Sequence, residues 1–339
     1  MAWWKRSSDL AEQPDAKAPA PAAASNALKA GLRSSRASGP DSQDPEDVFD
    51  EAFLARLELL QVIARRLFRG RQRAERKTRK VGSGLEFADH REYSPGDDIR
   101  NLDWGVLMRL GQTLIRLYEE DEDLPIRIAV DVSDSMLTSG GGKLRYAQQV
   151  AAALAYVGLA NLDRVGLTAT SRTIHHSLPA VRGKGRIFRV FDFLRQSQRG
   201  GPTDLRAALK RLAAESVQPG LTVVLSDFYD MDGAFDGLNL LRFRKHEPVA
   251  IQILDPREAR PDPAGVRGDV RLVDCEGGEA RDVTISPAIL KAYAEAHERF
   301  CAALHASCRS RGIPYFRAEI DVPFDELVLR MFRMGGLLR

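Results

Sequence analysis

Residues 126–136 read IRIAVDVSDSM and join an apolar run to three oxygen-bearing side chains. The five apolar or β-prone positions predict a buried strand that ends at Asp131. Ser133 and Ser135 follow at alternate positions. Polar groups at the end of a buried strand require hydrogen-bond partners or a bound ligand. Other segments of the chain indicate which of the two these groups have.

From residue 124 onward, strand patterns alternate with helix patterns. Strands are predicted at 126–131, 164–170, 221–226, 248–254 and 313–319, and helices at 143–159, 186–195, 204–215 and 286–311. This alternation is typical of an α/β domain with a mostly parallel sheet that is covered by helices on both faces. In such sheets, ligands bind beyond the carboxyl ends of the strands.

Oxygen-bearing side chains occur at this edge in three separate segments. Asp131, Ser133 and Ser135 follow the first strand, Thr203 in RGGPTDL precedes a helix, and Asp227 in TVVLSDF directly follows another strand. Two carboxylates and three hydroxyls, with no Cys or His, form a hard ligand set. Such a set suits Mg²⁺, or another divalent cation such as Mn²⁺ or Ca²⁺.

The loops around these residues bear on that interpretation. An extended loop after Asp131 would direct alternate side chains to one ion, and a loop at 137–142 (LTSGGG) would leave the site open on one side. Helix capping is the alternative, because Ser and Asp commonly cap helices and Thr203 precedes a helix that starts at Asp204. Three segments that meet at one sheet edge favour the ion site.

The parts outside the α/β segment differ in composition. Residues 1–46 are rich in Ala, Pro and Ser, which predicts a disordered tail in which the role of Trp3 and Trp4 stays open. The expected units are therefore the tail (1–46), a helix with a basic linker (47–80), a turn-rich segment with short strands near 86–93 and 112–118 (81–123), the α/β domain (124–320) and a C-terminal helical tail (321–339).

The length, the net charge and the number of cysteines restrict the class of protein. The chain has 339 residues, a net charge of +3 and three Cys, which argues against a disulfide framework. We find neither the apolar run of a signal peptide nor a transmembrane stretch in the sequence. We therefore expect a cytoplasmic protein.

The strand-end residues resemble a known site. Asp131, Ser133, Ser135, Thr203 and Asp227 match the D-x-S-x-S, Thr and Asp pattern of the metal-ion-dependent adhesion site of von Willebrand factor A domains. The resemblance implies a Rossmann-like α/β fold and a divalent ion whose shell a partner's carboxylate can complete. Asp134 departs from the pattern, because a small residue is common at that position.

The segment before this site carries a second, more specific resemblance. GLEFADHREYSPGDDIRNLDW looks like the signature of a bacterial family called domain of unknown function 58 (DUF58). The matching residues are Gly84, Glu86, Phe87, Arg91, Tyr93, Pro95, Gly96, Asp97, Asp98, Arg100, Asp103 and Trp104. We expect these residues to form a charge-paired, turn-rich unit, with Tyr93 and Trp104 anchoring it on the α/β domain or contributing to a partner-binding surface.

The two resemblances together imply a function. Members of the family are thought to act as adaptors or chaperone-like partners of MoxR-type AAA+ ATPases. We therefore expect a non-enzymatic protein-interaction module with no small-molecule substrate. One alternative is a metal-dependent phosphohydrolase, which Ser133 disfavours because it stands where an acid–base carboxylate is needed. The other is a nucleic-acid binder that uses the basic segment 65–80, which lacks interleaved aromatic residues.

Overall fold

The computed structural model describes residues 2–6, 48–68, 77–81, 86–121, 125–197, 200–215, 218–260, 268–276 and 280–334. Its centre is a six-stranded sheet in which β7 runs antiparallel to β6 and the other neighbouring strands are parallel. In spatial order the strands are β12 (Tyr315–Glu319), β9 (Glu247–Leu254), β8 (Leu221–Ser226), β5 (Pro125–Asp131), β6 (Arg164–Thr170) and β7 (Ile174–Arg182). The mostly parallel α/β architecture expected from the sequence is confirmed.

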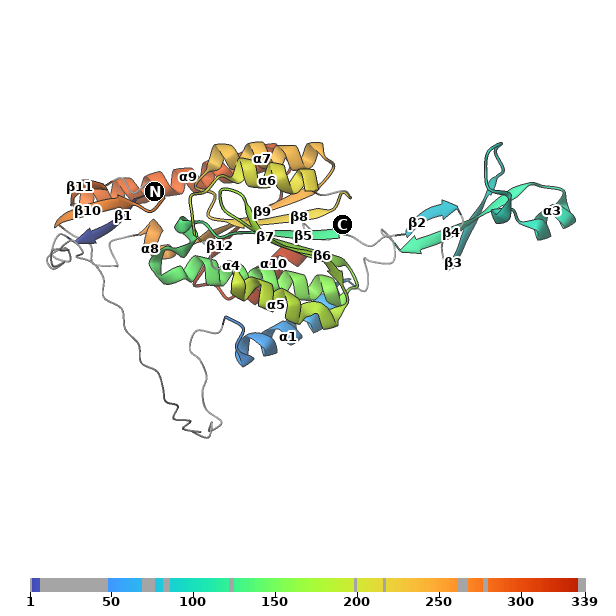
Figure 1. Cartoon of the computed structure of the whole chain (residues 1–339), viewed down its shortest axis with the longest axis horizontal. Helices are drawn as coiled ribbons and strands as arrows, with labels where there is room; N and C mark the ends of the chain where they lie inside the picture. The colour runs from blue at the N-terminus through green and yellow to red at the C-terminus, as the bar shows by residue number, and fades with distance from the viewer. Residues whose placement is uncertain are drawn as a thin grey trace, which may run out of the picture.

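Helices cover both faces of this sheet, as Figure 1 shows. One face is packed by α1 (Glu51–Phe68), α4 (Asp134–Ala160), α5 (Ile187–Gln196) and α10 (Phe324–Arg333). The other is packed by α6 (Leu205–Glu215), α7 (Met231–Phe243) and α9 (Pro287–Ser310). Alternate residues of β5 serve the two cores, which is why this strand carries apolar residues on both faces.

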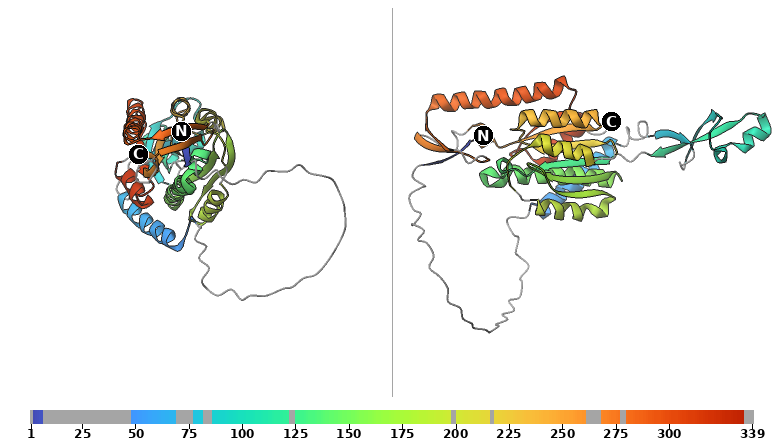
Figure 2. Two further views of the ribbon diagram at one scale, coloured as in Figure 1. Left: turned by 90° about the vertical axis from the view of Figure 1, so that its left-hand side faces the viewer. Right: turned by 45° about the horizontal axis from the view of Figure 1, so that its top comes forward.

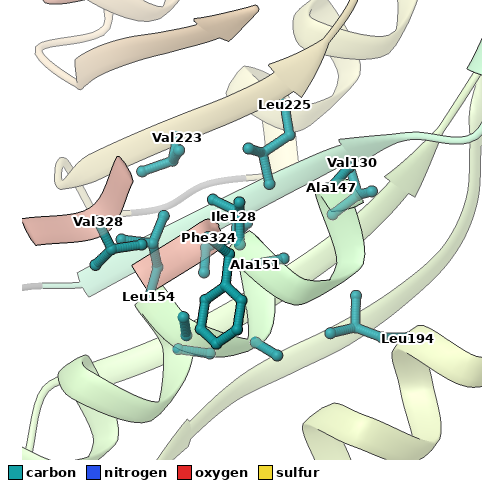
Figure 3. Close-up of a cluster of buried hydrophobic side chains, with 14 of the residues drawn as sticks. Ile128, Val130, Ala147, Ala151, Leu154, Leu194, Val223, Leu225, Phe324 and Val328 are labelled. Carbon is teal, nitrogen blue, oxygen red and sulfur yellow. The ribbon is translucent and has the colours of Figure 1, made fainter. Parts of the chain in front are cut away.

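Figure 3 shows the core between the sheet and the helices α4 and α10. Small residues of α4, such as Ala147 and Ala151, are fully buried there and allow the helix to lie close to the strands. Burying a Val, Leu or Phe side chain contributes about 1.5–3 kcal/mol. The labelled side chains are Ile128, Val130, Ala147, Ala151, Leu154, Leu194, Val223, Leu225, Phe324 and Val328.

Helices α1 and α10 belong to this core although the sequence placed both outside the domain. Phe53 of α1 and Phe324 of α10 are buried, and their ring centroids lie 4.7 Å apart. Helix α1 begins at Glu51 because the Asp50 carboxylate accepts the N–H of Phe53 at 2.7 Å. The segment 321–339 is therefore not a tail over its described part, since α10 completes the apolar core.

Two small antiparallel sheets lie at opposite ends of the molecule (Figures 1 and 2). The first contains β1 (Ala2–Arg6), β10 (Gly268–Asp274) and β11 (Ala280–Ile285). The second contains β2 (Lys77–Val81), β4 (Leu114–Asp121) and β3 (Glu86–Glu92), followed by the short helices η2 (Ile99–Asn101) and α3 (Trp104–Leu110). Residues 2–6 thus form a strand within the expected disordered tail, and residues 7–46 of that tail lie outside the described residues.

The stretch after Asp131 differs from the expected loop. Helix α4 begins at Asp134, so Ser135 lies in its first turn and residues 137–142 are helical. The expectation of an open loop at 137–142 is therefore wrong. Of the three glycines in this stretch, Gly141 is required by the backbone, because it adopts a φ of +75°, which an L-residue with a side chain rarely tolerates.

Candidate metal-binding site at the strand ends

The predicted carboxylates lie at the ends of two adjacent parallel strands. Val130 of β5 is in register with Leu225 of β8, so Asp131 and Asp227 follow at the same edge of the sheet. The chain leaves β5 toward β6 on one side, whereas β8 continues to β9 on the other. This is the switch point at which open α/β sheets bind ligands. Both carboxylates are buried, with exposures of 1% and 0%.

The hydroxyl groups after β5 are not used to cap the helix. Ser133 occupies the N-cap position of α4, yet its side chain makes no cap hydrogen bond. Its Oγ lies 3.0 Å from Oγ of Ser135, and both residues are buried. The backbone N–H of Ser133 donates to Asp131 Oδ1 at 3.0 Å. The loop therefore gathers three of the predicted ligands around one point.

Asp134, which the sequence left unexplained, connects this loop to the Thr203 segment. The N–H of Gly201 donates to Asp134 Oδ1 at 2.8 Å, and the N–H of Asp134 donates to the carbonyl of Gly201 at 2.9 Å. Helix α6 is capped by Asp204, whose carboxylate accepts the N–H of Ala207 at 2.8 Å. The Thr203 hydroxyl is not that cap. It donates to Glu276 Oε1 at 2.5 Å.

A buried lysine, which sequence reasoning missed, lies beside Asp227. Lys143 of α4 is fully buried, and its Nζ lies 2.9 Å from Asp227 Oδ2 and 2.8 Å from Glu258 Oε1. Glu258, in the short helix α8 (Pro256–Ala259), also accepts the Tyr229 hydroxyl at 2.8 Å. Although burial would lower it, the charges of Asp227 and Glu258 raise the pKa of Lys143 above its ordinary value. The ammonium group is therefore charged.

Ser226, just before Asp227, completes the arrangement around Asp131. Its hydroxyl donates to Asp131 Oδ2 at 2.6 Å and accepts the N–H of Phe228 at 3.0 Å. Oδ1 of Asp131 thus accepts the N–H of Ser133, and Oδ2 accepts the hydroxyl of Ser226. Each oxygen has a second lone pair, so Asp131 can still bind a cation.

The charges of this buried cluster fit a divalent cation. Asp131, Asp227 and Glu258 contribute three carboxylates against the single ammonium of Lys143, which leaves a charge of minus two when all are ionised. Burial, followed by the charge of Asp227, raises the pKa of Asp131 to about 7. Among the described residues, no three His, Cys, Asp or Glu side chains form a cluster that would hold a metal. The five predicted ligands depend on hydroxyls instead.

The signature segment folds as a charge-paired unit. Arg91 donates to Asp97 at 2.8 Å, and Asp98 caps η2 by accepting the N–H of Arg100 at 2.9 Å. Asp103 caps α3 and accepts hydrogen bonds from Arg116 and His90, which hold the pKa of its carboxyl well below the usual range.

The expected anchoring of Trp104 on the α/β domain is wrong. Trp104 is 56% exposed on α3, which lies at the far end of the molecule (Figure 1). The N–H of Tyr93 donates to the carbonyl of Thr113 at 3.0 Å, within the same small unit. Glu86 begins β3 and pairs with Glu119 of β4. The sequence did not foresee that this unit projects from the domain.

Several known proteins are similar to this chain. Uncharacterized proteins of Mycobacterium bovis and Mycobacterium tuberculosis are each 29% identical over 290 residues, covering 83% of this chain and 89% of theirs. The solved structure of BatB from Bacteroides thetaiotaomicron matches with a TM-score of 0.36 and 13% identity, over 62% of this chain and 99% of that one. Within the described residues, we find no helix with the length and apolarity needed to cross a membrane. The model of the family described as protein of unknown function DUF58 matches residues 89–302, more than half of the chain, which therefore belongs to that family.

Proposed function

We propose that the strand-end cluster binds a divalent cation, preferably Mg²⁺. We also propose that the α/β domain is of the von Willebrand factor A type. The donors are Asp131, Ser133, Ser135, Thr203 and Asp227. The observation that carries the proposal is the set of three buried carboxylates, with a single ammonium group, beside hydroxyls that do not cap a helix. When bound, the cation would supply a positive centre that attracts an additional anionic ligand.

The chain's own residues have separate tasks in this proposal. Asp131 and Asp227 provide the negative charge, Lys143 neutralises part of it, and Asp134 holds the Thr203 segment against the loop. Neutral hydroxyl ligands leave more of the cation's positive charge uncompensated than a ligand set made only of carboxylates would. A carboxylate from a protein partner is the ligand that such a site favours, and the family resemblance points to a MoxR-type AAA+ ATPase as that partner.

Calorimetric titration of Mg²⁺ into the full chain tests the site. We expect Asp131→Ala to weaken binding by at least about tenfold, because it removes a charged ligand whose interactions are worth at least about 1.4 kcal/mol. Asp232→Ala is the matched control, since Asp232 is an exposed carboxylate in the first turn of α7. Equal affinities for wild type and Asp131→Ala would rule out the site.

The partner is tested separately with purified proteins. A MoxR-type ATPase should bind the wild-type chain in Mg²⁺, and the complex should dissociate in EDTA. Asp131→Ala should reduce binding in Mg²⁺ to the level seen in EDTA. Binding that is equally tight in EDTA would contradict the proposed role of the cation in recognition.

A further inference from the structure

The β10–β11 hairpin brings a carboxylate of this chain to the strand-end site. Glu276, in the turn after β10, accepts two hydrogen bonds from Thr203, one from its N–H at 3.1 Å and one from its hydroxyl at 2.5 Å. Asp274 holds the backbone of Glu276 in place, because its Oδ1 accepts the N–H of Glu276 at 3.1 Å. Glu276 comes from a segment 73 residues further along the chain, so only the tertiary fold creates this contact.

The hairpin belongs to a separate small unit. It pairs with β1 in a three-stranded sheet. Among the described side chains, Ile285 packs with the partly buried Leu272 and Val283 of the hairpin and Leu290 of α9. Figures 1 and 2 show this sheet beside the end of the central sheet, away from the signature unit.

Glu276 brings a negative charge to Thr203, because its carboxylate accepts both the N–H and the hydroxyl of that residue. Glu276 is also chemically the same group that the proposed function assigns to the partner. It binds the hydroxyl of Thr203, which is one of the five proposed metal ligands.

We propose that Glu276 is an internal competitor for the partner's carboxylate, so that the β10–β11 hairpin restricts access to the strand-end site. This inference rests on the proposed function. A protein partner then has to displace Glu276 from Thr203. The contact makes recognition conditional, because the chain's own carboxylate must leave before an external one is accepted.

The test uses the full chain loaded with Mn²⁺, with acetate as the carboxylate probe. Water-proton relaxation reports how open the ion is to solvent and how tightly acetate replaces water. We expect Glu276→Ala and the nearly isosteric Glu276→Gln to raise the relaxation enhancement and tighten acetate binding by about tenfold, the scale of one charged hydrogen bond. Asp269→Asn is the control, because Asp269 bonds Thr284 within the same hairpin, away from the turn.

Hydrogen exchange provides a readout that requires no metal. The Thr203 amide should lose protection in Glu276→Ala and keep it in Asp269→Asn, with circular dichroism confirming that each variant is folded. Normal Mn²⁺ binding with unchanged acetate affinity in the Glu276 variants would overturn the inference and leave the proposed function intact. Mn²⁺ binding that Asp131→Ala does not weaken would overturn both.

Discussion

Replacing Lys143 with Met should destabilise the metal-free protein by about 3–5 kcal/mol, the cost of breaking a buried ion pair. Lys143 is 0% exposed, and its Nζ lies within 3 Å of carboxylate oxygens of Asp227 and Glu258. Methionine has a similar volume and leaves no large cavity. The loss therefore reflects two carboxylates that remain buried without their counter-charge.

Urea unfolding in EDTA, followed by circular dichroism, measures this loss. For a domain of this size, about 3–5 kcal/mol corresponds to a fall in Tm of roughly 6–20 °C. Adding Glu258→Gln to Lys143→Met should restore part of the stability, because it removes one of the uncompensated charges. Lys210→Met is the control for an exposed lysine on α6.

Metal binding gives the second half of this prediction. In the Lys143→Met variant, Mg²⁺ no longer competes with an ammonium group for Asp227, so its affinity should increase, and added Mg²⁺ should recover stability. A loss of less than about 1 kcal/mol, as expected for a surface ion pair, would refute the reasoning about the buried cluster. Mg²⁺ that fails to stabilise the variant would refute the link between lysine and cation.

Three further predictions concern individual contacts. The folded pKa of Asp131 lies above its ordinary value of 3.8, at about 7, so stability in EDTA should fall as pH rises from about 4 to 7; thermal unfolding should show this slope weakened in Asp131→Asn. Gly200→Ala should weaken Mg²⁺ binding in calorimetry, because a Cβ at Gly200 would overlap the Asp134 carboxylate, whereas an unchanged affinity would show that the loop tolerates displacement. Asp103→Asn should speed hydrogen exchange in α3, since it weakens the hydrogen bonds from Arg116 and the Val106 N–H; unaltered exchange would contradict that role.

The sequence predicted the inner strands of the central sheet well because they are buried on both faces. β5, β6 and β8 are almost fully buried, and their observed bounds differ from the expected ones by at most one residue. Strand β7 was missed because its side chains are exposed or half-buried and it contains Pro179, so its sequence shows no apolar pattern of a strand.

For the candidate site, the sequence showed which residues directly follow strands. It did not show which residues that are distant along the chain come into contact. Asp131 and Asp227 directly follow strands, so parallel topology alone brings them to one edge. Lys143 meets Glu258 across 115 positions, and Thr203 meets Glu276 across 73. No periodicity in the sequence encodes such contacts. The run of three glycines at 140–142 also suggested a loop, because glycine propensity alone does not reveal a helix that tertiary packing maintains.

The place of α10 in the core has a consequence for biosynthesis. Its buried residues, Phe324 and Val328 among them, are translated after every strand of the central sheet, yet they cover the same face as Phe53 of α1. A nascent chain that has completed β12 still exposes an apolar surface on the ribosome. Chains that stop before Phe324 should therefore be substrates for chaperones and proteases, even though every proposed metal ligand has already been made.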